Sequence, residues 1–187
     1  MYRHIPAALF FAASASAGAG DNEYVSFFNS VGGKLVKEYR LPVSGDMKYY
    51  WEMKTGFPYK TTDGSGNYKA PYWTSGDFNG DNKNDYAYIL INRNSGKKQL
   101  IVFLSKDDMY IAIKLSEPTD DEMGVATQHA GVLTTASGKG YWPPTPEDPP
   151  EINVKRHAIA YFAFESAASV FVWNDETKSF KQHWLSD

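Results

Sequence analysis

The hydrophobic and polar positions of this chain alternate in short blocks, and the clearest blocks lie in its middle. Residues 86–92 (YAYILIN), 99–104 (QLIVFL) and 109–115 (MYIAIKL) are rich in residue types that favour strands. Polar turns separate them at 93–96 (RNSG) and 105–108 (SKDD). Apolar runs of this length with short polar connections predict three antiparallel strands in a β-meander.

A second series of strands is predicted near the C-terminus. The runs cover residues 152–155, 158–164, 169–173 and 180–185, and the polar turn 174–178 (NDETK) separates the last two. They resemble the first series in composition and spacing. We therefore expect a second antiparallel meander.

The remaining segments predict irregular connections and few helices. The Asp-Asn pair at 21–22 is placed to cap one short helix, and Asp46 is placed to cap another over 47–54. Residues 117–123 are acidic, contain a proline and are expected to form a loop, whereas 131–134 (GVLT) can form a short strand. The predicted fold class is mainly β: two antiparallel meanders with long irregular connections and one or two short helices.

Composition supports an aromatic-rich β protein that is held together without disulfides. Aromatic residues make up 16% of the 187 residues, and they favour pleated, half-buried surfaces. The chain has no Cys, which excludes disulfides and thiolate metal sites. Its formal net charge of -3 comes without a basic patch or stripe, so we expect no nucleic-acid partner.

Residues 1–19 have the order of a secretory signal peptide. Arg3 precedes an apolar run over 5–13, and small residues of the A-x-A kind follow. The run is shorter than the roughly 20 residues that a membrane span needs, so no membrane span is expected. The predicted domains are therefore a signal peptide at 1–19 and a single β-rich domain at 20–187, in a periplasmic or secreted protein. A buried N-terminal helix is the alternative interpretation.

The stretch 77–85 (DFNGDNKND) carries a motif with clear metal chemistry. Calcium takes six to eight oxygen ligands, and alternate residues of a tight loop can point at one centre. With Asp77 counted as position 1, the backbone carbonyl of Lys83 would fall at position 7. Asn82, at position 6, tolerates the positive φ that such a loop needs. Oxygen-bearing side chains stand at positions 1, 3, 5 and 9, which are Asp77, Asn79, Asp81 and Asp85. The spacing predicts a Ca2+ site.

Residues 76–88 (GDFNGDNKNDYAY) resemble the calcium loop of FG-GAP/VCBS-type repeats, which occur in integrin-like propellers and bacterial surface proteins. The resemblance implies calcium ligation by Asp77, Asn79, Asp81 and Asp85. It departs from the family at Asn82, where glycine is usual. Because the sequence has a single such loop, we expect one structural calcium site at the entry to the 86–104 hairpin rather than a propeller. A metal-free polar turn, which uses the same residue types, is the alternative.

The sequence contains no recognisable catalytic motif, so a non-enzymatic protein is expected. The histidines His4, His129, His157 and His183 show neither an H-E-x-x-H motif nor a paired spacing. Ser166 does not lie in a G-x-S-x-G motif. An enzyme whose active site assembles from distant residues is the alternative.

An aromatic and proline-rich stretch is the best candidate for a partner-binding surface. Residues 142–150 (WPPTPEDPP) contain five prolines, which favour extended backbone. Aromatic anchors beside a rigid segment lose little entropy on binding. The predicted partner-binding residues are Tyr141, Trp142, Pro143 and Pro144. Alternatively, this segment covers the edge of a sheet.

These features together predict a non-enzymatic exported binding protein that is stabilised by calcium and inhibits or neutralises a protein partner, as immunity-type proteins do. The prediction rests on a β scaffold with surface loops and no catalytic set, since a fold alone does not imply a function. The alternative is a calcium-dependent cell-surface or carbohydrate adhesion module.

Overall fold

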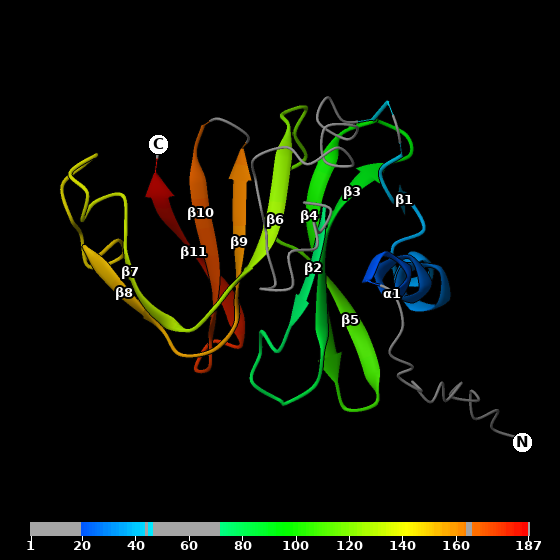
Figure 1. Ribbon diagram of the computed structural model, residues 1–187, viewed down its shortest axis with the longest axis horizontal. Coiled ribbons are helices and arrows are strands. Elements are labelled where there is room, and N and C mark those ends of the chain that lie inside the picture. The colour runs from blue at the N-terminus through cyan, green and yellow to red at the C-terminus, as the bar shows by residue number, and fades with distance from the viewer. Residues whose placement is uncertain (1–19, 44, 47–71, 164–165, 187) are drawn as a thin grey trace, which may run out of the picture.

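The computed structural model describes residues 20–43, 45–46, 72–163 and 166–186 (Figure 1). The predicted signal peptide at 1–19 and the predicted helix at 47–54 lie outside these residues. The chain starts with a helical segment of three parts, α1 (Gly20–Phe27), η1 (Phe28–Gly32) and α2 (Gly33–Leu35). The strands are β1 (Tyr39–Arg40), β2 (Trp73–Gly76), β3 (Asp85–Asn92), β4 (Lys98–Lys106), β5 (Met109–Lys114), β6 (Met123–Gln128), β7 (Gly131–Thr134), β8 (Glu151–Val154), β9 (Ala158–Ala163), β10 (Ala168–Asn174) and β11 (Ser179–Ser186).

The predicted first meander is confirmed as three neighbouring strands, β3, β4 and β5, of a five-stranded antiparallel sheet. Its strands follow the order β1-β3-β4-β5, and β2 pairs with β3 as well. The β3–β4 ladder runs from Tyr86 opposite Phe103 to Ile91 opposite Lys98. Side chains on both faces of β3 and β4 are buried. Burial on both faces explains why these strands read as almost continuous apolar runs.

Aromatic rings join one face of this sheet to the helical segment. The Phe27 ring stacks on Tyr86, with ring centres 4.0 Å apart, and meets Phe103 edge-on at 5.6 Å. The buried hydroxyl of Tyr88 donates to the Tyr24 carbonyl at 2.9 Å, so its polar end is satisfied. The helix therefore forms a layer over this face (Figure 1).

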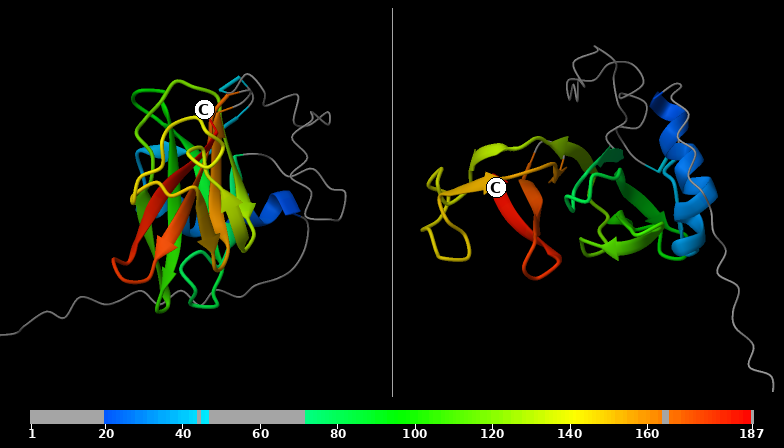
Figure 2. Two further views of the ribbon diagram at one scale, coloured as in Figure 1. Left: turned by 90° about the vertical axis from the view of Figure 1, so that its left-hand side faces the viewer. Right: turned by 90° about the horizontal axis from the view of Figure 1, so that it is seen from below.

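A four-stranded antiparallel sheet, in the order β11-β10-β9-β6, packs on the other face of the first sheet (Figure 2). Its Ile159 and Tyr161 belong to the same buried core as β3 and β4. Hydroxyl groups also join the two sheets. Thr127 donates to the Ser75 carbonyl at 2.8 Å, and its oxygen lies 2.6 Å from the hydroxyl of Thr74.

The two-stranded sheet β7–β8 forms a further layer on the outer face of the second sheet. A small separate core lies between them, with buried Val154, Ala158 and Val170. The molecule is thus layered as helix, five-stranded sheet, four-stranded sheet and hairpin (Figure 2). Among the described residues, no helix combines the length and the apolar character that crossing a membrane would require.

The predicted mainly β class is confirmed, but the second meander differs from the prediction. Strands β9, β10 and β11 form it, whereas β8 pairs with β7 instead. The place beside β9 is taken by β6, which the sequence does not predict. The composition of the acidic, proline-containing segment 117–123 is typical of a loop, so the sequence gives no sign that β6 begins at Met123.

Candidate functional site

The acidic loop, defined as residues 77–85, connects β2 to β3 and turns through two left-handed residues. Asn82 has φ +62°, as the sequence predicts for position 6, and Gly80 has φ +81°. Asparagine is among the few residues other than glycine that adopt this conformation readily. The loop therefore closes without the glycine that is usual at position 6.

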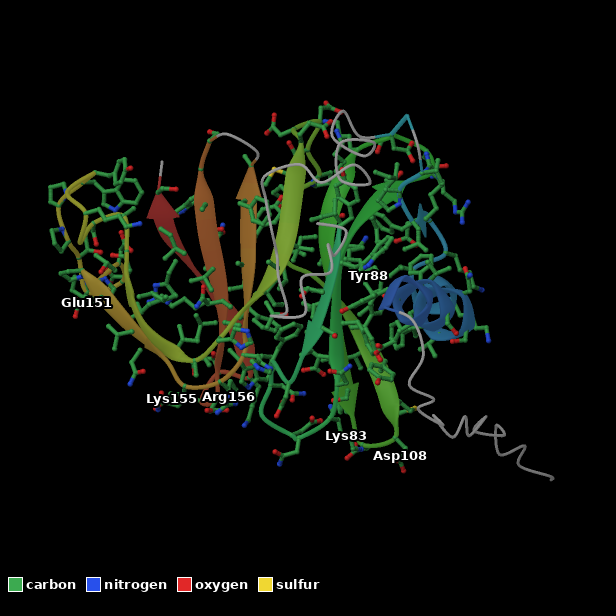
Figure 3. The ribbon with its side chains drawn as sticks, viewed as in Figure 1. Lys83, Tyr88, Asp108, Glu151, Lys155 and Arg156 are labelled. Carbon is green, nitrogen blue, oxygen red and sulfur yellow. The ribbon has the colours of Figure 1, made fainter. Side chains whose placement is uncertain are left out.

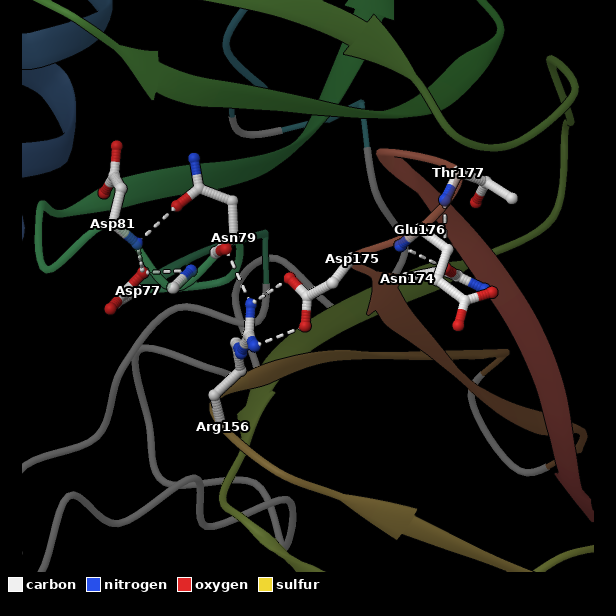
Figure 4. Close-up of polar contacts among 9 residues, drawn as sticks. Asp77, Asn79, Asp81, Arg156, Asn174, Asp175, Glu176 and Thr177 are labelled. Atoms are coloured by element: carbon white, nitrogen blue, oxygen red, sulfur yellow. Dashed lines mark hydrogen bonds and ion pairs between the residues drawn. The ribbon is translucent and has the colours of Figure 1, made fainter.

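Side-chain oxygens within the loop hold its backbone in place. Asp77 Oδ1 accepts the N–H groups of Gly80 and Asp81 at 2.6 and 3.1 Å, and its Oδ2 accepts the N–H of Asn82 at 3.0 Å. The side-chain oxygen of Asn79 accepts the Asp81 N–H at 3.0 Å (Figure 4). Such local bonds order a turn without any metal.

Asp85 is fully buried and ties the loop to β4. Its Oδ2 accepts the N–H groups of Phe78 and Asn79 at 2.8 and 3.3 Å, and its Oδ1 accepts the N–H of Ser105 at 2.7 Å. Burial raises the pKa of Asp85 to about 6, although these hydrogen bonds favour the ionised form. Ionisation of Asp85 is therefore less favourable in the folded protein than in water.

The hydroxyl of Ser105 lies between two carboxylates. Its Oγ is 2.7 Å from Asp81 Oδ2 and 3.0 Å from Asp85 Oδ1. A hydroxyl has one hydrogen to donate, so it cannot satisfy both oxygens fully. None of the ion pairs formed within the described part of the chain includes either carboxylate. The two carboxylates therefore concentrate negative charge around one hydroxyl group.

The predicted metal ligands fit calcium in chemistry, but only in part in geometry. Asp77, Asn79, Asp81 and Asp85 offer oxygen donors, as a hard cation prefers. Asp81 and Asp85 come together at Ser105, whereas Asp77 turns toward backbone N–H groups. Across the described ranges, no three His, Asp or Glu side chains converge in the manner of a metal site.

Lys83, predicted to contribute its carbonyl oxygen, fastens the loop to the β4–β5 turn through its side chain. The ammonium donates to the Asp107 carbonyl and lies 3.6 Å from Asp108 Oδ1. Figure 3 shows Lys83 and Asp108 beside each other at this end of the first sheet. The backbone N–H of Lys83 donates to Asp81 Oδ1 at 2.9 Å. The loop is thus anchored to both β4 and the turn that follows it.

Arg156 joins the acidic loop to the second sheet, a role that the sequence does not reveal. Its Nη1 donates to the Asn79 carbonyl at 2.6 Å, and its guanidinium pairs with both oxygens of Asp175 at 2.9 and 2.7 Å (Figure 4). The guanidinium also holds the pKa of Asp175 below its ordinary value. It lies so close to Gly80 that a Cβ there would collide with it. No local pattern predicts these contacts, because they join distant segments.

The proline loop, defined as residues 135–150, is closed by hydrogen bonds across its base. The Thr135 hydroxyl donates to the Pro149 carbonyl at 2.6 Å. Trp142 is half-buried, and its indole N–H donates to the carboxylate of Asp148. Trp142 therefore helps to hold the loop together, in addition to its predicted role in partner binding.

The other predicted partner-binding residues point to solvent. Tyr141 is 53% exposed, and Pro143 and Pro144 are exposed too. Trp184 of the edge strand β11, which is 43% exposed, accepts the Ala136 N–H on its carbonyl at 2.8 Å. The loop therefore covers part of the β11 edge, as the alternative interpretation expects, and also presents an aromatic residue.

The acidic loop and the proline loop lie at separate places on the molecule. The acidic loop connects β2 and β3 at the lower end of the first sheet in Figure 1, whereas the proline loop lies beyond β7 and β8 on the far side of the second sheet. Figure 2 shows the same separation. A ligand on one loop would therefore not contact the other directly.

Comparison with protein-family models, with curated proteins and with solved structures gives no match for this chain. The resemblance of the acidic loop to FG-GAP/VCBS-type repeats therefore stays a prediction from its residues.

Gly80→Ala should destabilise the protein more than Gly96→Ala. Both glycines have positive φ, +81° and +73°, which costs an alanine about 1–2 kcal/mol. A Cβ at Gly80 would also displace the Arg156 guanidinium, whereas nothing lies within 4 Å of a Cβ at Gly96. Urea unfolding measures both costs. In an Arg156→Ala background the two costs should become equal, and a persistent difference would contradict the assigned contact.

Asp85 should make the chelator-treated protein less stable as the pH rises from about 4 to about 6. The unfolded carboxyl ionises near its ordinary pKa of 3.8, whereas the folded one keeps its proton up to about 6. The folded state therefore binds more protons in this window, and the free energy of unfolding falls with rising pH, by up to ~3 kcal/mol. Urea unfolding at several pH values should show that Asp85→Asn removes this slope. An equal slope in the variant would refute the assignment.

Proposed function

We propose that this protein is a non-enzymatic exported binding protein, in which the proline loop contacts a protein partner and calcium stabilises the acidic loop. Export is proposed from the signal-peptide pattern of residues 1–19. The observation that carries the binding role is an exposed aromatic residue, Tyr141, on a loop that hydrogen bonds fix at its base. Such an anchor is already ordered, so little conformational entropy is lost on binding.

Further apolar side chains support a binding surface at this end of the molecule. Val132 on β7 is 65% exposed, and Trp184 on β11 is hydrogen bonded through its carbonyl to the proline loop. Both residues belong to strands that adjoin the proline loop, and aromatic anchors supply much of the binding energy at protein interaction sites. A partner held on this surface would be inhibited or neutralised by being covered.

Calcium in this proposal is a structural ion. The acidic loop offers oxygen donors, and Asp81 and Asp85 share the single hydroxyl of Ser105 without a cation in an ion pair with either, within the described residues. A divalent cation would reduce the electrostatic repulsion between the carboxylates of Asp81 and Asp85. Because the proline loop lies elsewhere, the ion would act on stability rather than on contact with the partner (Figure 1).

Calcium at 10 mM should raise the melting temperature of the chelator-treated protein by roughly 3–10 °C, for a dissociation constant on the order of 10⁻⁴–10⁻³ M as in extracellular modules. Asp81→Ala should lower the melting temperature in calcium and should abolish the response, so that chelator and substitution are not additive. Asp108→Ala is the matched control, because Asp108 is exposed and lies beside the loop without being a proposed ligand. Thermal melts that respond to neither chelator nor Asp81→Ala would reduce the loop to a polar turn.

Tyr141→Ala should abolish partner binding while leaving stability within about 0.5 kcal/mol, because the ring is largely exposed. The measurement is a pull-down from periplasmic extract with the wild type, with Tyr141→Ala and with Met109→Ala. Met109 is 68% exposed on β5, in the other sheet, so its loss should leave binding intact.

The results of this pull-down, of a glycan-binding assay and of a hydrolysis assay would decide between the functions. A stoichiometric protein partner that is lost with Tyr141→Ala supports the proposal. Glycan binding that is lost with chelator supports the adhesion alternative instead. Hydrolysis of cell-wall polymer by the pure protein would overturn both.

A further inference from the structure

Two histidines that are distant in the sequence lie next to each other at one end of the β6–β9 pair in the second sheet. Strands β6 and β9 are antiparallel neighbours, and their last described pair is Gln128 opposite Ala158 (Figure 1). His129 follows β6 and His157 precedes β9, so the two occupy the next opposed positions. Directly opposed residues of an antiparallel pair bring their Cβ atoms to about 4.5–5.5 Å. The side chains can therefore act on the same small ligand.

The spacing of the two rings suits a single tetrahedral ion. Their centres lie 5.3 Å apart, and their planes make an angle of 71°. A zinc–nitrogen bond of about 2.0–2.1 Å puts the ion about 3.2 Å from each ring centre, so a tetrahedral angle separates the centres by about 5.2 Å. The observed separation therefore needs little change for one nitrogen of each ring to reach a shared ion.

The surroundings leave this pair open to an ion. His129 is exposed and His157 is half-buried. The His157 ring packs closely on Gly76, where a Cβ would lie 2.8 Å from Nδ1, so Nε2 is the His157 nitrogen that we assign to the ion. The neighbouring guanidinium of Arg156 is paired with Asp175, which reduces its repulsion of a cation. No third His, Asp or Glu converges with the pair among the described residues, so two positions of a tetrahedral ion remain for water or an added donor.

We propose that His129 and His157 form a binding site for one borderline divalent cation, with Zn2+ as its representative. Each neutral imidazole supplies one nitrogen, the donor that zinc, copper and nickel prefer over the oxygen donors that suit calcium. The site is therefore chemically different from the acidic loop and does not depend on the proposed function. An ion held here joins the end of β6 to the start of β9.

The test is calorimetric titration of the full chain with ZnCl₂ in a buffer that contains excess Ca2+, so that the acidic loop is saturated with calcium. We expect one zinc equivalent to bind. His129→Gln and His157→Gln should each weaken binding by at least about tenfold, since loss of even an outer partner of a metal ligand costs about 10–100-fold. His183→Gln is the control and should keep wild-type zinc affinity.

Absence of zinc binding by the wild type would overturn the proposal, and so would binding that survives both His129→Gln and His157→Gln. Thermal melts without zinc check that each variant is folded. In the wild type, the imidazole NMR signals of His129 and His157 should shift together on zinc addition, while that of His183 stays in place. This measurement tests the site even where a variant fails to fold, and unmoved signals would count against it.

Discussion

Burial of the β3–β4 pair on both faces is the constraint on which the rest of this structure depends. Tyr88, Ile89, Val102 and Phe103 are wholly removed from solvent. A strand pair with two apolar faces needs a layer on each side, because exposing either face to water would cost about 25 cal/mol for every Å² of apolar surface. The aromatic residues of the helical segment supply one layer, and the four-stranded sheet supplies the other.

This burial determines the properties of the acidic loop. Asp85 opens β3 and is therefore carried into the covered region, where backbone N–H groups and one shared hydroxyl are its hydrogen-bond donors. A carboxylate in such a place is costly to ionise, and its pKa rises accordingly. The loop is then held on three sides, by β4, by the β4–β5 turn and by Arg156, which lies between β8 and β9. A bound cation would add to a loop that already has a defined conformation.

The layered order also separates the proline loop from the two proposed metal sites, which lie near each other because His157 packs on Gly76, the residue before the acidic loop. The acidic loop lies at the end of the first sheet, and the histidine pair lies where β6 and β9 meet. The proline loop is attached to the outer edge strand β11, as the bond from Ala136 to Trp184 demonstrates. Stability and recognition can therefore change independently in this chain, because the residues that we propose for each do not contact one another.

Elements that depend on local residue patterns could be predicted before the structure was known. Continuous β-forming runs predicted β3, β4 and β5, and the oxygen spacing of 77–85 with a left-handed Asn82 predicted a tight polar loop. What required the tertiary structure were the pairings between distant segments: β6 beside β9, β7 with β8, Ser105 between two carboxylates, Arg156 on the acidic loop and His129 opposite His157. Local patterns report which conformation a segment prefers. They do not predict which distant segment will pack on it, because this packing depends on how all the layers bury their apolar faces together.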